Sequence, residues 1–199
     1  MTTLKELFSS ECKFIAGATS IEQIPKNTFV PEVAFVGRSN VGKSSLINAV
    51  LGKNCARVSK QPGRTQQINF FSLQDKVFLT DLPGYGYAAV SKQTRKLWDS
   101  LILDYLRGRQ NLRRIFLLID SRHGIKDNDA QIMDILDDSA VVYQIVLTKI
   151  DKISSTDNIM RQVEEKISKR TAAFSSIIAT SSEKGIGIKD VQSVIMSFL

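Results

Sequence analysis

One nine-residue segment constrains the fold of this chain more than any other. Its residues are Gly37-Arg38-Ser39-Asn40-Val41-Gly42-Lys43-Ser44-Ser45. They match the pattern G-x-x-x-x-G-K-[ST], in which glycines let the backbone turn tightly and its N–H groups cradle phosphate oxygens. An apolar run at 33–36 predicts a buried strand before it, and 45–51 predict a helix after it. This order indicates a phosphate-binding loop rather than a chance glycine-rich turn.

Two side chains of this loop have expected roles in binding and catalysis. Lys43 can reach the β- and γ-phosphates of a nucleotide, and the Ser44 hydroxyl can ligate Mg²⁺. We therefore expect Lys43 to stabilise charge during phosphoryl transfer and Ser44 to hold the metal.

The rest of the chain alternates between strand and helix patterns. A predicted hairpin comes first, and apolar strands then alternate with amphipathic helices. The expected elements are strands at 68–73, 76–80, 112–120, 141–147 and 176–179 and helices at 92–107, 127–136, 154–170 and 188–199. This predicts a three-layer α/β sandwich around a mostly parallel six-stranded sheet with one antiparallel edge strand. We expect a single domain at 31–199, with residues 1–30 as an N-terminal extension that packs on it. This extension holds a possible short helix at Leu4, Leu7 and Phe8 and a possible edge segment around Phe14-Ile15-Ala16.

The net charge and the lack of long apolar runs indicate which class of partner this chain binds. The formal net charge of +7 suggests a polyanion, with RNA ahead of a membrane surface, although an evenly solvated basic surface is the alternative. We find no apolar run long enough to span a bilayer and no signal-peptide pattern, so a cytoplasmic protein without a membrane partner is expected. Cys12 and Cys55 have no motif spacing and are expected to be free thiols.

Basic residues are concentrated in a few segments of the sequence, whereas acidic residues gather elsewhere. The basic residues are Lys53, Arg57, Lys60 and Arg64, then Lys92, Arg95 and Lys96, and finally Arg107, Arg109, Arg113 and Arg114. The acidic residues are Asp127, Asp129, Asp134, Asp137 and Asp138. This segregation favours an RNA-binding surface beside the nucleotide site.

Further candidate residues lie at the ends of predicted strands. Asp81 ends the hairpin, where P-loop proteins place a carboxylate linked to Mg²⁺, and Gly84 offers an N–H to a γ-phosphate. Asp151, in the segment Thr148-Lys149-Ile150-Asp151, can accept hydrogen bonds from the N1–H and 2-amino groups of guanine. Adenine lacks this donor pair, so guanine should be preferred. The Lys149 stem can lie over the base, and Ser181-Ser182 can supply a small residue and an N–H for the guanine oxygen.

The order and spacing of these motifs resemble the translation-factor-related GTPases of the P-loop class and, within them, the EngB (YihA/YsxC) family. The motifs are those at 37–45, Gly63-Arg64-Thr65, Asp81-Leu82-Pro83-Gly84-Tyr85-Gly86-Tyr87-Ala88, 148–151 and Thr180-Ser181-Ser182-Glu183-Lys184-Gly185-Ile186-Gly187. The resemblance implies a Ras-like GTPase that binds GTP or GDP with Mg²⁺, assists assembly of the large ribosomal subunit on ribosomal RNA, and is linked to division septum formation. It also implies that Thr65 ligates Mg²⁺ and, with Gly84, is drawn toward the γ-phosphate.

Three positions depart from the commonest GTPase pattern. Thr148 replaces an asparagine, although its hydroxyl can still bond to the phosphate loop. Tyr85 stands where Ras-like proteins have a glutamine that orients water, so hydrolysis is expected to be slow without a partner. Asn40 occupies a position at which some related GTPases hold K⁺, and a role limited to bracing the loop is equally open.

Two other functions fit parts of the sequence. An RNA-binding module could use a guanine nucleotide as a structural ligand only. A small-molecule kinase could also use a phosphate loop, but an arginine-bearing lid and an acceptor site are not evident in the sequence. A monomer is the default expectation.

Overall fold

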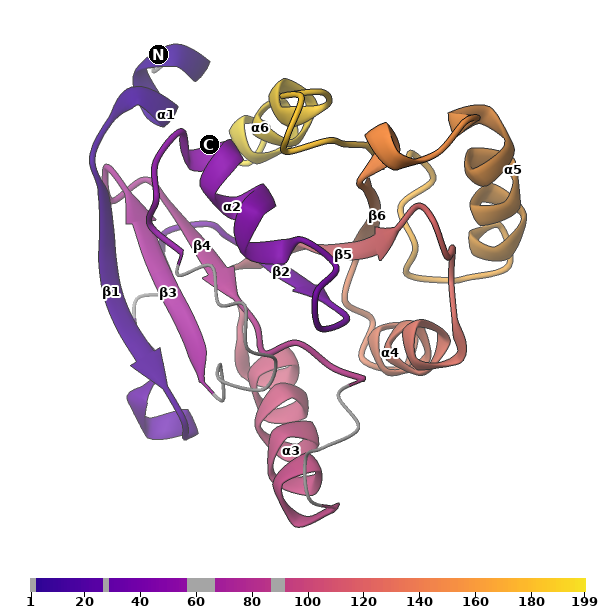
Figure 1. The fold of residues 1–199 in the computed structure, drawn as a ribbon. Helices are drawn as coiled ribbons and strands as arrows, with labels where there is room; N and C mark the ends of the chain where they lie inside the picture. Colours follow the sequence, from indigo (N-terminus) through magenta and orange to yellow (C-terminus); the bar gives the residue numbers. More distant parts are fainter. Residues whose placement is uncertain (1–2, 27–28, 57–66, 87–91) are drawn as a thin grey trace.

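A computed structural model describes residues 3–26, 29–56, 67–86 and 92–199, with the backbone alone for 92–99. Within these residues seven strands form one sheet, in the order β1-β3-β4-β2-β5-β6-β7 (Figure 1). The strands are β1 (Cys12–Ala18), β2 (Glu32–Gly37), β3 (Ile68–Leu73), β4 (Val77–Asp81), β5 (Leu112–Asp120), β6 (Tyr143–Thr148) and β7 (Ile178–Ala179). Neighbouring strands from β4 to β7 pair in parallel, and β3 is antiparallel to both of its neighbours.

The sheet therefore has one more strand than the six expected, and its antiparallel strand β3 is not at the edge. The edge strand is β1, from the N-terminal segment. It pairs with β3 through a register shift between Phe14 and Ala16, which leaves Ile15 as an extra residue. Phe14 is 58% exposed and packs edge-on against Phe71. This irregular, half-exposed segment lacks the regular alternation that identifies a strand.

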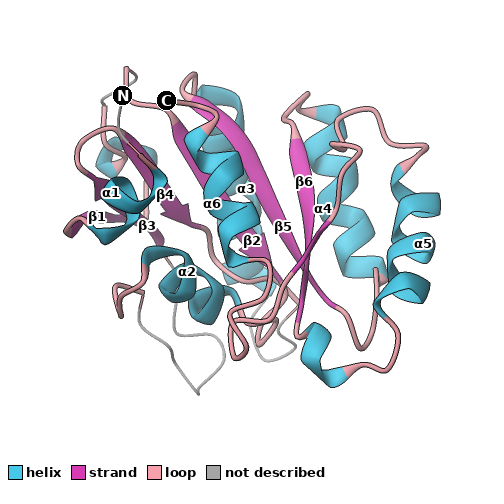
Figure 2. Cartoon of the chain, turned by 90° about the horizontal axis from the view of Figure 1, so that it is seen from above, coloured by secondary structure: helices cyan, strands magenta, loops and turns pink. Residues whose placement is uncertain are grey.

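Helices cover both faces of the sheet, which confirms the three-layer architecture (Figures 1 and 2). On one face lie α1 (Leu4–Ser9), α2 (Lys43–Leu51) and α6 (Ile188–Met196). On the other lie α3 (Lys92–Gly108), α4 (Asp127–Asp138) and α5 (Thr156–Ile167). Successive residues of β2 alternate between the two cores: Val33 and Phe35 face α2, and Ala34 and Val36 face α3.

Helix ends differ from the sequence expectation by a few residues. α5 begins at Thr156 because the Ser155 side chain accepts a hydrogen bond from Asn158 N and caps the helix. It ends at Ile167 rather than at 170, and α6 ends at Met196 rather than at 199. Among the described helices, none is long and apolar enough to cross a membrane. Cys12 and Cys55 are free thiols, as expected.

Candidate nucleotide-binding site

The phosphate loop joins a fully buried strand to a helix. Every residue of β2 is buried, and the loop that follows packs against β5. A Cβ at Gly37 would lie 2.8 Å from Val41 Cγ1 and 3.0 Å from Leu118 Cβ, so only glycine fits there. Gly42 has a φ of 103°, in the left-handed region, and no side chain caps the first turn of α2. The N–H groups of that turn, which includes Ser44 and Ser45, are thus left for an anionic ligand.

Lys43 and Asp81 form an ion pair at the mouth of this loop. Their side chains are 10% and 7% exposed, at the start of α2 and the end of β4. A lysine ammonium and a carboxylate brought together here fit a Mg–nucleotide, in which phosphates would bind the lysine and Mg²⁺ the carboxylate. The described residues hold no cluster of three or more His, Cys, Asp or Glu that could bind a metal. A site of one carboxylate, the Ser44 hydroxyl and substrate phosphates suits Mg²⁺.

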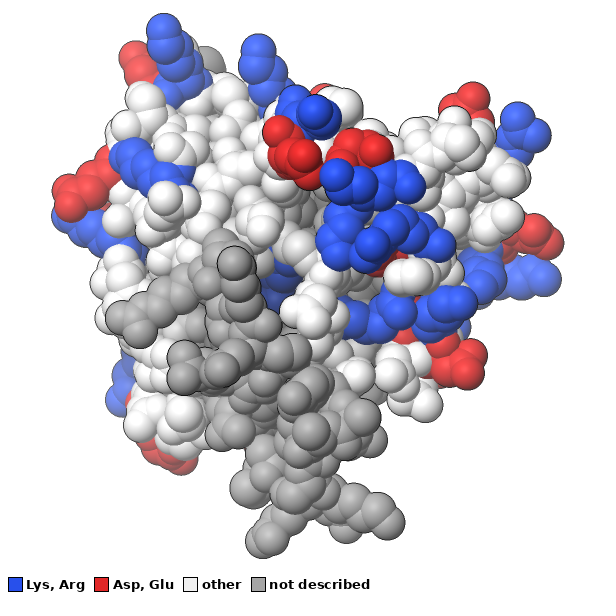
Figure 3. Space-filling view, in the orientation of Figure 1, with Lys and Arg blue, Asp and Glu red and all other residues white. Residues whose placement is uncertain are grey.

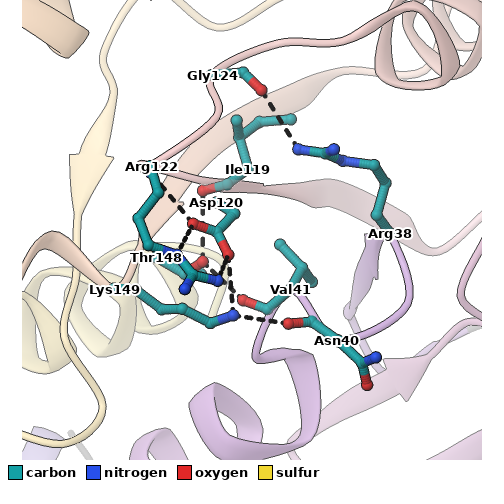
Figure 4. Close-up of polar contacts among 9 residues, drawn as sticks. All are labelled: Arg38, Asn40, Val41, Ile119, Asp120, Arg122, Gly124, Thr148 and Lys149. Carbon is teal, nitrogen blue, oxygen red and sulfur yellow. Dashed lines mark hydrogen bonds and ion pairs between the residues drawn. The ribbon is translucent and has the colours of Figure 1, made fainter. Parts of the chain in front are cut away.

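The segment after β6 is tied directly to the phosphate loop (Figure 4). Thr148 Oγ1 donates to the Val41 carbonyl at 2.7 Å, so the residue that replaces asparagine bonds to the loop. Lys149 has a φ of 59°, and its Nζ donates to the Asn40 carbonyl at 2.7 Å and to Asp120 Oδ2 at 2.8 Å. These contacts fix the position of the Lys149 stem beside the loop.

Asp120, at the end of β5, is a site residue that the sequence reasoning missed. It accepts two hydrogen bonds from the Arg122 guanidinium, at 2.9 and 2.8 Å, besides the bond from Lys149. Burial alone would raise the pKa of Asp120, but these bonds outweigh it and hold the pKa far below its ordinary value. Its position at the end of a parallel strand, two residues before an arginine, was the available signal.

Asp151 follows in the 3₁₀ turn Ile150–Lys152. Its Oδ1 accepts from the Ser181 hydroxyl at 2.6 Å, and Oδ2 lies 3.0 Å from Lys152 Nζ, although no donor is aligned for a hydrogen bond to Oδ2 among the described residues. The Ser181 bond first, and then Lys152, lower the pKa of Asp151. The carboxylate is therefore ionised near neutral pH and has acceptor capacity left for two guanine N–H donors.

Ser181 and its neighbours are held by the backbone after β7. Thr180 N donates to the Leu147 carbonyl at 2.7 Å, and Ser181 and Ile186 exchange two backbone hydrogen bonds. A cavity of about 810 Å³ extends from the phosphate loop to this segment. Its lining includes Gly42, Ser45, Arg122, Thr148, Lys149, Asp151 and Ser182. The structure thus brings part of the phosphate loop and several base-binding candidates to one cavity at the carboxyl ends of the parallel strands.

The segment after β4 lies across the phosphate loop. Gly84 approaches the loop closely: a Cβ on it would lie 3.4 Å from the Gly37 carbonyl oxygen and 3.5 Å from Ser39 N. The Tyr85 carbonyl accepts from Ser39 N at 3.0 Å, and the Tyr85 side chain turns to α4. Of the remaining candidates, Gly63, Arg64 and Thr65, with Arg57 and Lys60, lie outside the described residues, as do the side chains of Lys92, Arg95 and Lys96.

Two arginines assigned to an RNA surface are instead internal. Arg109 is 7% exposed and forms an ion pair with Glu32 at 2.6 Å. Arg114 is 9% exposed, lies 3.9 Å from the Phe174 ring centroid and donates to Gln144 at 2.9 Å. Both lie near the start of β5, at the opposite end of that strand from Asp120. The prediction for this pair was wrong because burial depends on tertiary packing that local sequence does not show.

Comparison with known proteins defines the class of this site. Residues 32–149 match the model of a family described as 50S ribosome-binding GTPase. The sheet, phosphate loop and base-binding segments are those of a P-loop GTPase, so the chain is a GTP-binding protein that hydrolyses GTP.

Relatives identify the family more narrowly. Proteins described as probable GTP-binding protein EngB include one from Ruegeria sp. (strain TM1040), 49% identical over 98% of this chain and 91% of that protein. Another, from Caulobacter vibrioides (strain NA1000 / CB15N), is 50% identical over 95% of this chain and 83% of its own length. This chain belongs to the EngB family.

Solved structures share the fold. A crystal structure of a probable GTP-binding protein EngB aligns with a TM-score of 0.69 and 23% identity, over 84% of this chain and 97% of that one. Era in complex with MgGDPNP and nucleotides 1506–1542 of 16S ribosomal RNA aligns with a TM-score of 0.67 and 24% identity, over 87% of this chain and 58% of that one. These likenesses concern the arrangement of the sheet and helices.

Proposed function

We propose that this GTPase is a nucleotide-controlled switch that docks on the large ribosomal subunit, acts in its assembly in the cytoplasm, and is required for normal septum formation. The observation that carries the proposal is the basic surface beside the nucleotide cavity. Lys and Arg side chains gather over the loops between α2 and α5, with a few acidic groups among them (Figure 3). The family description, 50S ribosome-binding GTPase, supports the ribosome as the partner.

Three exposed lysines sit on loops that also carry, or lie next to, candidate site residues. Lys126 precedes α4, Lys152 follows Asp151 and is 49% exposed, and Lys184 lies in the loop that carries Ser181. Such cations can neutralise RNA phosphates, and their placement next to the nucleotide makes RNA affinity sensitive to nucleotide state.

The residues of this chain have defined parts in the proposed mechanism. Lys43 exchanges its ion pair with Asp81 for phosphate oxygens, and Asp151 accepts from guanine. Ser44, Thr65 and Asp81 would hold Mg²⁺, which when bound would supply positive charge against the phosphates. Tyr85 has no amide to orient water, so we infer that GTP hydrolysis by the isolated protein is slow. A ribosomal partner then supplies the group that completes the catalytic site, or a cation such as K⁺, held at Asn40, would supply it. The protein acts as a monomer.

Co-sedimentation with large ribosomal subunits tests the proposal. The protein is loaded with a non-hydrolysable GTP analogue, with GDP or with nothing, and pelleting is expected with the GTP analogue alone. The double variant Lys126→Glu/Lys184→Glu should weaken that binding about tenfold and reduce its salt dependence, because each lost phosphate contact lowers the salt slope by about one.

The matched control reverses two charges near the starts of β5 and β6, at the opposite end of these strands from the cavity. Arg113, which the sequence alone grouped with the RNA-binding surface, lies here with Lys169, and both are exposed, so Arg113→Glu/Lys169→Glu changes net charge equally without altering the proposed face. Equal weakening by both double variants would indicate a general charge effect and contradict a specific face. Equal pelleting in all nucleotide states would contradict the switch.

A further inference from the structure

The Tyr85 side chain is hydrogen-bonded to Asp129, a buried carboxylate of α4. Its Oη donates to Asp129 Oδ1 at 2.7 Å, and the Asp129 side chain is 0% exposed. Arg38 Nε, from the phosphate loop, lies 3.2 Å from the same oxygen, and Arg38 Nη2 donates to the Gly124 carbonyl at 3.3 Å (Figure 4). One carboxylate thus joins the phosphate loop, α4 and the segment after β4.

Asp129 is a rigid anchor for this contact. Its Oδ2 accepts from Lys126 N at 2.8 Å, so the side chain also caps the N-terminus of α4. Burial, and then the charge of Asp129, raise the pKa of Tyr85 well above its ordinary value, so the phenol stays a neutral donor. Gly86 also approaches α4, since a Cβ there would lie 3.0 Å from Asn128 Nδ2.

The hydrogen bond from Tyr85 to Asp129 also fixes the Tyr85 backbone, which is bonded to the phosphate loop. Tyr85 N donates to the Gly37 carbonyl at 3.3 Å, and the Tyr85 carbonyl accepts from Ser39 N at 3.0 Å. The N–H groups of a phosphate loop bind anionic oxygens, so the Tyr85 carbonyl occupies a donor that phosphate could use. GTP carries one more phosphate than GDP and competes more strongly for such donors.

We propose that Tyr85 and Asp129 are positioning residues that favour GDP over GTP by holding this carbonyl against Ser39. A ligand shifts a conformational equilibrium only by its differential affinity for the two states. GTP must displace residues 84–86 from the phosphate loop to bring Gly84 to its γ-phosphate, whereas GDP leaves these residues in place. This inference concerns nucleotide discrimination by the isolated protein and does not rest on ribosome docking.

The test compares Tyr85→Phe with Tyr105→Phe. Tyr105 is a residue of α3, and its Oη also donates to a buried carboxylate, Glu32, in the core between α3 and the sheet. Titration of the nucleotide-free proteins with GDP and a non-hydrolysable GTP analogue gives the ratio of the two dissociation constants. Tyr85→Phe should shift that ratio about tenfold in favour of the GTP analogue. This is the size expected when a hydrogen bond to a charged group is lost from the GDP-bound arrangement and not from the GTP-bound one. Tyr105→Phe should lower thermal stability and leave the ratio unchanged.

Hydrogen exchange supplies a readout without nucleotide. The Tyr85 and Ser39 amides should exchange faster in Tyr85→Phe than in the parent protein, and at the parent rate in Tyr105→Phe. Asp129→Asn, which keeps an acceptor but not the charge, should shift the affinity ratio in the same direction by a smaller factor, and it replaces Tyr85→Phe if that variant does not fold. An unchanged ratio in folded Tyr85→Phe or Asp129→Asn, or an equal shift in Tyr105→Phe, would overturn the proposal.

Discussion

Asp120 shows how one buried carboxylate can organise the segment after β6, which is the candidate segment for binding the base. Its side chain is 6% exposed and lies between Arg122 and Lys149, whose side chains are 43% and 29% exposed. Lys149 also donates to the Asn40 carbonyl, so Asp120 is one of two groups that fix the position of the Lys149 side chain. The same lysine stem is the one expected to lie over guanine.

Replacing this carboxylate should weaken both folding and binding. Because both cations are partly exposed, Asp120→Asn should lower the free energy of unfolding at pH 7 by about 1 kcal/mol rather than the larger values of fully buried pairs. Guanine nucleotide affinity should fall about fivefold, which corresponds to a loss of about 1 kcal/mol in binding free energy. Urea unfolding and nucleotide titration measure the two effects, and Asp104→Asn, at an exposed position on α3, should change stability by less than about 0.5 kcal/mol.

The pH dependence has a definite sign. The pKa of Asp120 in the folded state is below its value of about 3.9 in an unfolded chain. Its contribution is therefore present above about pH 4 and is lost as pH falls through the folded-state pKa. The stability difference between the parent and Asp120→Asn should shrink as pH falls below about 4, and a constant difference would contradict this account.

At the scale of elements, a buried ion pair connects three parts of the chain on the α3 side. Glu32 begins β2 and is 0% exposed, and it accepts hydrogen bonds from Thr80 at 2.9 Å and from Tyr105. Arg109, just after α3, donates to Glu32 at 2.8 Å and also to the Pro25 carbonyl of the N-terminal segment.

Removing one partner of this pair should be costly. Arg109→Ala leaves the Glu32 charge buried without its cation, and a loss of about 3–5 kcal/mol in the free energy of unfolding is expected. Arg107→Ala, two residues earlier at an exposed position, is the control and should cost less than about 0.5 kcal/mol beyond its helix propensity. Denaturant unfolding distinguishes them, and a loss below 1 kcal/mol for Arg109→Ala would show that the pair contributes little.

These elements also show what sequence can and cannot predict. The phosphate-loop motif, the parallel strands and the place of residues 148–151 at a strand end were predicted because each depends on a few adjacent residues with strict backbone or chemical requirements. The partners of Glu32, the contact of Asp120 with Lys149 and the contact of Asp129 with Tyr85 were not, because they join segments distant in sequence. Strand β1 was expected only as a possible edge segment around residues 14–16 and was not among the six expected strands, because its bulge and exposed side chains hide the two-residue period.

At the scale of the molecule, the N-terminal segment extends the sheet beyond β3. Leu7 and Phe8 of α1 are 0% and 6% exposed and join the core formed by α2 and α6. Along β1, register pairs run from Cys12 with Leu73 to Ala18 with Ile68. The segment thus covers both an apolar surface and the edge of β3, whose unpaired backbone groups would otherwise face solvent.

We propose that residues 31–199 fold as the GTPase domain and that the segment before them is a stabilising cover. Deleting residues 1–18 should lower the thermal midpoint by several degrees and cause concentration-dependent aggregation, because the edge of β3 becomes available for pairing with another chain. Guanine nucleotide affinity should change less than twofold, since the cavity lining lies entirely within 42–183. Calorimetry, light scattering and nucleotide titration measure these three effects. The double variant Leu7→Ala/Phe8→Ala separates the two roles: it should lower the midpoint through lost core packing while β1 still covers β3, so aggregation of the folded protein should not increase. A deletion that abolishes nucleotide binding in a folded protein would instead make the N-terminal segment part of the GTPase domain.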